Sequence, residues 1–450
     1  MDTRCASTKI SRSDDPSVDI MHVINILLLV VHTAHAFTHS LDGPWDFFTS
    51  DGKYHAQIVV PGAWEAQGIG DPTSRMHHQY IGGTIYQRTI HNMSWVGAGN
   101  RLFLVIEHVH RSVQVFVNGA FLGSHIGYMD VLQFDVTKYA TAPSLDIALH
   151  VNSSRPPATD PLEGAMDVDT DGIWNGVGGW GGIYGHVYLD ARPPFYIDTI
   201  REGPPHVQCH VIAGGDAICA INVTLSAEPR DAHGSYYIAA VVGDAKNTTL
   251  VPSAATSVVV EIVVPEAQLW TPETPHLYTA SIELLDGSKR VVDAHNVTFG
   301  VREIVTKGYT FLLNGKPLFL RGYGDDSVYP STMAPPATKA LYLRKLRFAK
   351  SVGFNFVRHH SHVLPAAYFE AADEVGVLVS PELQCAYGQY YDAANAVGLA
   401  LYRSTWRGYI KRLRNHPSIF DWAPVKILQN TFSDRAHCAL HSYGPDPHSC

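Results

Sequence analysis

The sequence contains no block of Lys and Arg, no apolar run long enough to cross a bilayer, and few cysteines. Its net charge of −9 is spread along 450 residues, which argues against nucleic acid or an anionic membrane surface as a partner. The apolar run from Val23 to Val31 is shorter than the roughly 20 residues of a membrane-spanning helix. Six cysteines are too few for a disulfide scaffold. The 46% apolar content indicates a folded protein of several domains.

The first 36 residues are predicted to be a leader. Residues 1–20 are polar, and Met21 precedes the apolar run and Ala34-His35-Ala36, a small-x-small pattern typical of cleavage sites. We expect a signal peptide at 21–36, with Met21 as the natural initiator. The alternative is a buried N-terminal segment, because between Met21 and the run there is His22 but no Lys or Arg.

Five N-glycosylation sequons support a secreted or secretory-lumen protein, since this modification occurs on the surfaces of secreted proteins. Their acceptor residues are Asn92, Asn152, Asn222, Asn247 and Asn296.

One pair of cysteines flanks a predicted turn. Cys209 and Cys219 enclose HVIAGGDAI, in which Gly214-Gly215 predicts a hairpin. Equal spacing about the turn would place the cysteines opposite each other. A cross-strand disulfide and two buried free thiols both stay open. The remaining cysteines lack metal-ligand spacing.

The patterning divides the chain into two β-rich regions and one α/β region. Residues 37–192 contain many short strands, with Val113, Val115 and Val117 on one face before the hairpin signal Asn118-Gly119, and predict a sandwich or jelly roll. Residues 193–301 have the length and alternation of an immunoglobulin-like sandwich.

From residue 302 to 423, strands alternate with helices, as in parallel βα units. The expected buried strands are 317–324, 354–360, 377–383 and 418–423, and the expected helices are 335–353, 365–376 and about 393–414. This pattern predicts the first half of a (β/α)8 barrel. Residues 424–450 show no such pattern and are expected to be an aberrant or disordered tail.

Two motifs match ligand-binding fingerprints in residue type but lack other features that those fingerprints require. GVGGWG (176–181) resembles a dinucleotide fingerprint, but a strand rather than a helix is expected after it, so a tight loop around Trp174 and Trp180 is favoured. Asp167, Asp169 and Asp171 begin like a calcium loop, yet Gly178 occupies the position of the final Glu. A solvated acidic loop is the default there.

Candidate site residues follow the second and third parallel strands, whose carboxyl ends form the active face of such barrels. The segment FVRHHSH places Arg358, His360 and His362 there, and Glu382 ends the next strand. Zinc binding is the weaker reading of the histidines, and hydrogen bonding to a polyhydroxylated ligand is favoured. Asp373 and Glu374 lie in a helix and are expected to be solvated charges.

Several stretches, taken in order, resemble glycoside hydrolase family 2, which includes β-galactosidases, β-glucuronidases and β-mannosidases. LDGPWDF, VPGAWEAQG, VNGAFLGSHIG and GGWGGIYGHVYL resemble its sugar-binding jelly roll. LWTPETPHLY and FGVREI resemble its immunoglobulin-like domain, and FLLNGKPLFLRG, NFVRHHSH and RNHPSIFDW resemble its barrel. The resemblance covers about residues 38–423 and depends on the order and spacing of these motifs together.

The resemblance implies a retaining β-glycosidase that acts on carbohydrate without a cofactor. Arg358 and His362 match the family's substrate-site Arg and His, although RHHSH is one residue longer than usual, and Glu382 is similar to an acidic residue that serves the site. The mechanism needs an acid/base Glu and a nucleophile Glu. The acid/base is expected in Asn-Glu after Trp422-Ala423, where this sequence has Pro424.

Neither catalytic Glu has a counterpart in this sequence, so we expect the chain as written to be inactive. A frameshift, retained intron or wrong exon after Ala423 is the favoured explanation. The alternatives are a carbohydrate-binding or interaction protein built on the jelly roll, and a protein with other chemistry.

Overall fold

The computed structural model describes residues 37–71, 80–97, 99–127, 129–154, 180–226, 234–360, 362–383 and 396–423. The chain divides into two compact units, Met1–Ala34 and His35–Cys450, and every described residue belongs to the second. The expected leader, the acidic loop with Asp167, Asp169 and Asp171, and the tail at 424–450 lie outside the described residues. No helix in the described part of the chain is long and apolar enough to cross a membrane.

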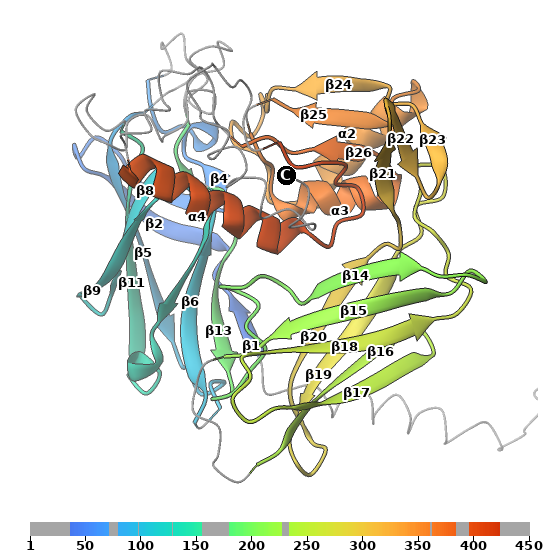
Figure 1. The fold of residues 1–450 in the computed structure, drawn as a ribbon. Helices are drawn as coiled ribbons and strands as arrows, with labels where there is room; N and C mark the ends of the chain where they lie inside the picture. Colours follow the sequence, from blue (N-terminus) through green and yellow to red (C-terminus); the bar gives the residue numbers. More distant parts are fainter. Residues whose placement is uncertain are drawn as a thin grey trace, which may run out of the picture. The chain divides into compact units, whose positions relative to one another are not determined.

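The first β-rich region is built from two sheets that share one core (Figure 1). Their strand orders are β1-β13-β6-β10 and β3-β2-β5-β11-β8-β9. The strands are β1 (Phe37–Ser40), β2 (Gly43–Thr49), β3 (His55–Val60), β5 (Gly83–His91), β6 (Arg101–Glu107), β8 (Ser112–Val117), β9 (Ala120–Ile126), β10 (Val131–Asp135), β11 (Ser144–Asn152) and β13 (Val187–Arg192). A small third sheet joins β4 (Gly62–Ala63), β12 (Gly182–Ile183) and β7 (Val109–His110).

The alternation of residues along β8 is confirmed. Val113, Val115 and Val117 are all buried, because successive side chains of a strand point to opposite faces. The chain then turns back into β9 at Asn118-Gly119, where both residues have positive φ (49° and 75°).

The second β-rich region contains two more sheets around a separate core. Their orders are β14-β15-β18 and β17-β16-β19-β20. The strands are β14 (His206–Val211), β15 (Ala217–Thr224), β16 (Tyr236–Val242), β17 (Ala245–Val251), β18 (Ser257–Val264), β19 (Tyr278–Leu285) and β20 (Val291–Phe299). Together with the first region, these sheets confirm the expected multidomain β architecture.

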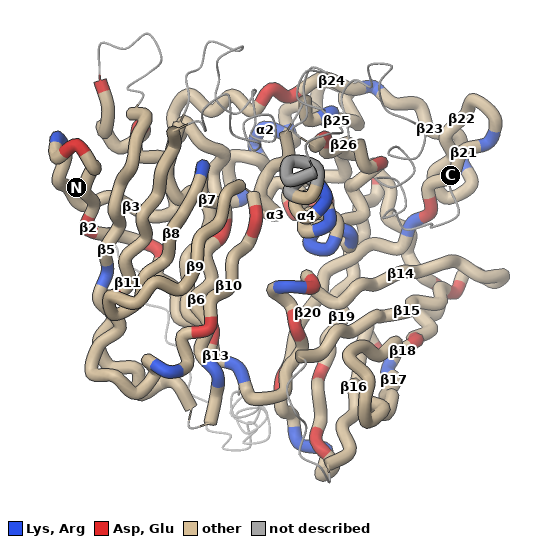
Figure 2. The backbone as a smooth tube through the Cα atoms, turned by 60° about the vertical axis from the view of Figure 1, so that its left-hand side comes forward, with Lys and Arg blue, Asp and Glu red and all other residues tan. Residues whose placement is uncertain are grey.

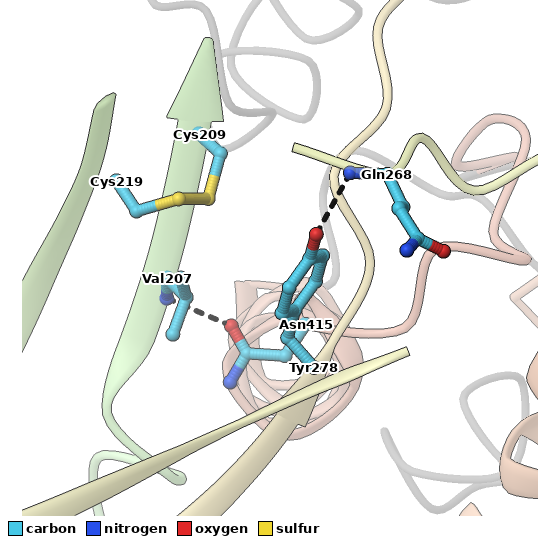
Figure 3. The surroundings of a disulfide bond; sticks show 6 residues. All are labelled: Val207, Cys209, Cys219, Gln268, Tyr278 and Asn415. Atoms are coloured by element: carbon cyan, nitrogen blue, oxygen red, sulfur yellow. Dashed lines mark hydrogen bonds between the residues drawn. A yellow bond between two sulfur atoms is a disulfide. The ribbon is translucent and has the colours of Figure 1, made fainter. Parts of the chain in front are cut away.

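A disulfide joins Cys209 and Cys219, which lie opposite each other in β14 and β15 (Figure 3). Close to it, the side chain of Asn415 accepts a hydrogen bond from the Val207 amide (3.0 Å) and donates one to the Pro205 carbonyl (2.8 Å). Strand β14 is therefore covalently tied to β15 and hydrogen-bonded to the segment after helix α4 (Ala396–Leu413).

The α/β region contains parallel strands separated by helices (Figure 1). The elements are β24 (Gly322–Asp325), α2 (Lys339–Ser351), β25 (Phe356–His359), α3 (Ala366–Val375), β26 (Leu378–Ser380) and α4 (Ala396–Leu413). Residues 419–423 continue the sheet, because Val379 pairs with Ile419 and Glu382 with Ala423 in parallel bridges. That these βα units are half of a (β/α)8 barrel stays a prediction.

The helices end where glycine permits a left-handed conformation. Gly376 has φ 76° and donates its amide to the Ala372 carbonyl (2.8 Å), and Gly353 after α2 has φ 97°. Both ends agree with the predicted ones.

The expected buried strand at 317–324 is wrong. Asn314-Gly315 turns the chain so that β23 (Lys316–Leu318) pairs antiparallel with β22 (Thr310–Leu313), which also pairs with β21 (Ile304–Lys307). The side chain of Phe319 is 75% exposed, and the parallel strand begins only at Gly322. Residues 317–324 therefore contain the end of the β22–β23 hairpin and the start of a separate, mostly exposed edge strand, β24.

The expectation that Asp373 is a solvated charge is also wrong. Asp373 is buried, and its carboxylate accepts hydrogen bonds from the Ser418 amide (3.0 Å) and from His416 Nδ1 (2.6 Å). Its backbone carbonyl accepts one from the buried Trp270 Nε1 (3.0 Å). Glu374 is exposed and ion-paired with Lys339.

We predict that replacing the disulfide by Cys209→Ser with Cys219→Ala lowers the free energy of unfolding by about 2–3 kcal/mol, because the bond closes a short loop in the unfolded chain. Urea denaturation with and without reductant measures this. Reductant should weaken the parent chain and leave the double variant unchanged, and equal stability of both chains would contradict the prediction.

Candidate functional site

The candidate site lies where the parallel strands end. Asp325 at the end of β24 is in register with His359 at the end of β25, and Arg358 is in register with Ser380 of β26. Glu382 lies beyond β26 beside Ala423. Carboxyl ends of parallel strands meet at one edge of a sheet, and this edge gathers the site residues that the sequence predicted.

Arg358 and Glu382 form an ion pair of 2.6 Å. The Glu382 side chain is only 1% exposed, whereas that of Arg358 is 45% exposed. A buried carboxylate therefore anchors a guanidinium that still has a face free to solvent. Such a group presents several fixed N–H donors to an oxygen-rich ligand.

The predicted histidines differ in their exposure. His360 is partly exposed and its Nδ1 lies 2.6 Å from Asp326 Oδ1. His362 is buried, and burial lowers its pKa. Its neutral ring donates Nδ1–H to the His360 carbonyl (2.9 Å), which leaves Nε2 as an acceptor. His360 can therefore contact a ligand, while His362 supports the loop behind it.

Sequence reasoning missed Asp325. Its carboxylate is buried, lies 2.6 Å from Lys345 Nζ of α2 and accepts a hydrogen bond from the Ser327 amide (3.0 Å). Burial alone would raise its pKa, but its electrostatic interactions with His362 and with the Lys345 ammonium outweigh burial and lower the pKa to about 2. The available signal was its position directly after the expected strand at 317–324.

The ring geometry does not favour zinc. The rings of His359 and His362 stack with centroids 5.0 Å apart and an interplanar angle of 14°, so their nitrogens do not converge on one point. Within the described ranges, no group of three or more His, Cys, Asp and Glu side chains is arranged to hold a metal ion.

The glycine-rich motif leads into a strand. Gly182 and Ile183 form β12, so the helix that a dinucleotide site requires does not follow. Gly181 packs against Trp64, whose ring a Cβ there would strike, and its amide donates to the buried Glu65 carboxyl (3.0 Å). Burial raises the pKa of Glu65 to about 8. This second buried acid was also missed from the sequence.

The described part of the chain thus combines two β-sandwiches with parallel βα units that carry polar side chains at their strand ends. The family model described as Glycosyl hydrolases family 2 matches residues 205–302. This match lies in the second β-rich region, and the relatives and solved structures below extend the similarity to this family over most of the chain.

Relatives share sequence over most of this chain. A beta-galactosidase of Thermoanaerobacter pseudethanolicus is 24% identical over 344 residues, which are 74% of this chain and 43% of that protein. A beta-glucuronidase of Paenibacillus borealis is 24% identical over 379 residues, which are 79% of this chain and 60% of that protein. The chain thus spans less than two thirds of the length of these relatives.

Solved structures share the fold. Bifidobacterium dentium beta-glucuronidase, complexed with coumarin-3-O-glucuronide, aligns with a TM-score of 0.73 at 24% identity over 91% of this chain and 71% of that chain. The beta-glucuronidase of Ruminococcus gnavus aligns with a TM-score of 0.72 at 19% identity over the same shares.

We predict that Arg358→Ala lowers the free energy of unfolding by about 1–3 kcal/mol, because it leaves the buried Glu382 carboxylate without its cation. Adding Glu382→Gln should recover part of this loss and give a coupling energy of about 1–2 kcal/mol in a double-mutant cycle. The exposed pair Arg290–Asp286, at 2.8 Å, is the matched control and should couple by less than about 1 kcal/mol. Equal coupling in both pairs would contradict the prediction.

We predict that Asp325 stabilises the fold above about pH 4 and that this contribution disappears as the pH falls through about 2, because its folded-state pKa of about 2 lies below the ordinary 3.8. Asp325→Asn should therefore cost about 2 kcal/mol at pH 6 and nearly nothing at pH 2. Denaturation across this range, with the exposed Asp46→Asn as control, measures the difference. A cost that does not vary with pH would refute this assignment.

Proposed function

We propose that this chain belongs to a lineage of retaining β-glycosidases and that the ends of β24, β25 and β26 bind the sugar of a β-glycoside. The match to the family model supports the reaction class, and relatives named beta-glucuronidase and beta-galactosidase support a β-glycoside as the ligand. The Arg358–Glu382 ion pair is the observation that assigns sugar binding to these strand ends. It holds a half-exposed guanidinium two residues before His360. Sugar hydroxyl oxygens can accept hydrogen bonds from the N–H groups of Arg358.

Hydrolysis with retention requires two carboxyl groups roughly 5 Å apart, one as acid/base and one as nucleophile. No glutamate follows Glu382 in the sequence, and Pro424 stands where the resemblance expects Asn-Glu. Asp325 and Glu382 at the strand ends do not fit the role of the acid/base. Glu382 is buried against Arg358, and Asp325 is paired with Lys345 and has a pKa of about 2, too low for an acid that must hold a proton near neutral pH. We therefore propose that the sequence as written does not hydrolyse glycosides.

The second candidate is a non-catalytic carbohydrate-binding or interaction protein built on the jelly roll. The complete pair of sheets between Phe37 and Arg192 favours it, since this part needs neither catalytic glutamate to bind a sugar. Secretion, supported by the sequons and the leader pattern, is part of both proposals.

The test uses the purified full chain with 4-nitrophenyl β-glucuronide and β-galactoside, first for turnover and then for saturable binding by calorimetry. We expect no turnover, and we expect Arg358→Ala to weaken binding of the recognised glycoside about tenfold or more, whereas Arg290→Ala leaves it unchanged. Arg290 is the control because it belongs to an exposed pair in the immunoglobulin-like region.

Turnover that Arg358→Ala abolishes would overturn the claim of inactivity and keep the site. Binding that Arg358→Ala leaves intact would reject the strand-end site and support the jelly-roll alternative. The absence of any glycoside binding would reject both.

A further inference from the structure

A cavity of about 730 Å³ lies apart from the strand-end site, where the two β-sandwiches and helices α3 and α4 meet. None of Asp325, Arg358, His362 and Glu382 lines it. The walls that matter here come from the jelly roll (Glu107, Tyr188), from the helices (Tyr409, Arg412) and from β20 (Asn296, Thr298). Its volume is within the range of about 300–1,000 Å³ typical of ligand pockets, so a short oligosaccharide fits.

The wall formed by β20 carries a complete sequon. Asn296 and Thr298 are exposed on one face of the strand, while Val297 and Phe299 between and beyond them point into the core. Asn296 and Thr298 both line the cavity, together with His295 and Val297 of the same strand. The side-chain amide of Asn296 makes no hydrogen bond to another described residue, in contrast to that of Asn247, which donates to the Glu261 carbonyl (2.8 Å).

The opposite walls offer the groups that sugars contact. Tyr188 and Tyr409 provide aromatic rings, and Glu107 and Arg412 provide an acceptor and donors for hydroxyl groups. Figure 2 shows residues of both charge signs on the elements around this region. Two hydrogen bonds connect the helical wall to residues 200 and 205, since Arg412 donates to the Ile200 carbonyl (2.8 Å) and Asn415 to the Pro205 carbonyl (2.8 Å).

We infer that Asn296 carries an N-linked glycan whose first sugar residues occupy this cavity and hold the two β-sandwiches and the helices together. In the transfer, the Asn296 amide nitrogen bonds to the anomeric carbon of a lipid-diphosphate-linked oligosaccharide. The bond from that carbon to the diphosphate breaks, and one amide proton leaves with the lipid diphosphate. The transfer precedes folding, so the cavity does not have to admit an enzyme.

The other sequons provide internal controls. Asn92, Asn152, Asn222 and Asn247 are exposed and do not line the cavity. Glycans on them would project into solvent. The inference thus separates one site, with a structural glycan, from four peripheral sites in the same chain.

The first experiment expresses the full chain behind a heterologous secretion signal in a eukaryotic cell, which makes the test independent of the chain's own leader. Glycopeptide mass spectrometry should find Asn296 occupied. Peptide N-glycosidase should release this glycan from the native protein at least about tenfold more slowly than those at Asn92 and Asn222, because release requires local opening of the cavity. After denaturation, the sites should be released at equal rates.

The second experiment compares variants by thermal denaturation. Asn296→Gln and Thr298→Ala remove the sequon in two ways and should lower the Tm by about 3–6 °C, whereas Thr298→Ser keeps the sequon and should behave like the parent. Asn222→Gln is the matched control and should change the Tm by less than about 1 °C.

An unoccupied Asn296 in a chain glycosylated at Asn92 and Asn222 would overturn the inference. Equal release rates from the native protein would also overturn it, and this measurement requires no variant to fold.

Discussion

The buried carboxylate of Asp373 is the contact on which the site most depends. From α3, this carboxylate accepts hydrogen bonds from the Ser418 amide and from His416 Nδ1. It thereby positions the segment that leads into residues 419–423. Those residues pair with β26 next to Glu382. The backbone carbonyl of Asp373 accepts a hydrogen bond from Nε1 of Trp270, which belongs to the immunoglobulin-like region. One helical position therefore joins a β-sandwich to the fourth parallel strand.

The strand-end site combines buried supports with exposed contacts. Glu382 and Asp325 are buried acids, each compensated by one cation, Arg358 or Lys345. A buried charge without a partner is costly, so each acid constrains where its cation lies. The buried Glu382 carboxylate therefore holds the Arg358 guanidinium at the surface. This division explains how the edge keeps its geometry without a bound ligand.

A solved beta-glucuronidase that is 24% identical shares the fold over 91% of this chain. The fold therefore tolerates wide change in sequence, because sandwiches and βα units need apolar residues at the right period rather than particular side chains. Function depends on fewer positions. In this chain the charged residues at the strand ends, Asp325, Arg358 and Glu382, are the positions on which the proposed site depends.

Sequence by itself determined the features that depend on near neighbours in the chain. Local period and φ preference account for the alternation at Val113 to Val117, the turn at Asn118-Gly119 and the glycine after α3. They also account for the opposite positions of Cys209 and Cys219 about Gly214-Gly215, whereas the sequence left open whether the two form a disulfide. Tertiary structure alone decided the burial of Asp373, the pairing of Asp325 with Lys345 and the cavity beside Asn296. Local patterns state which face of an element is apolar. They do not state which distant element covers that face, and it is the covering element that sets burial, charge pairing and cavity shape.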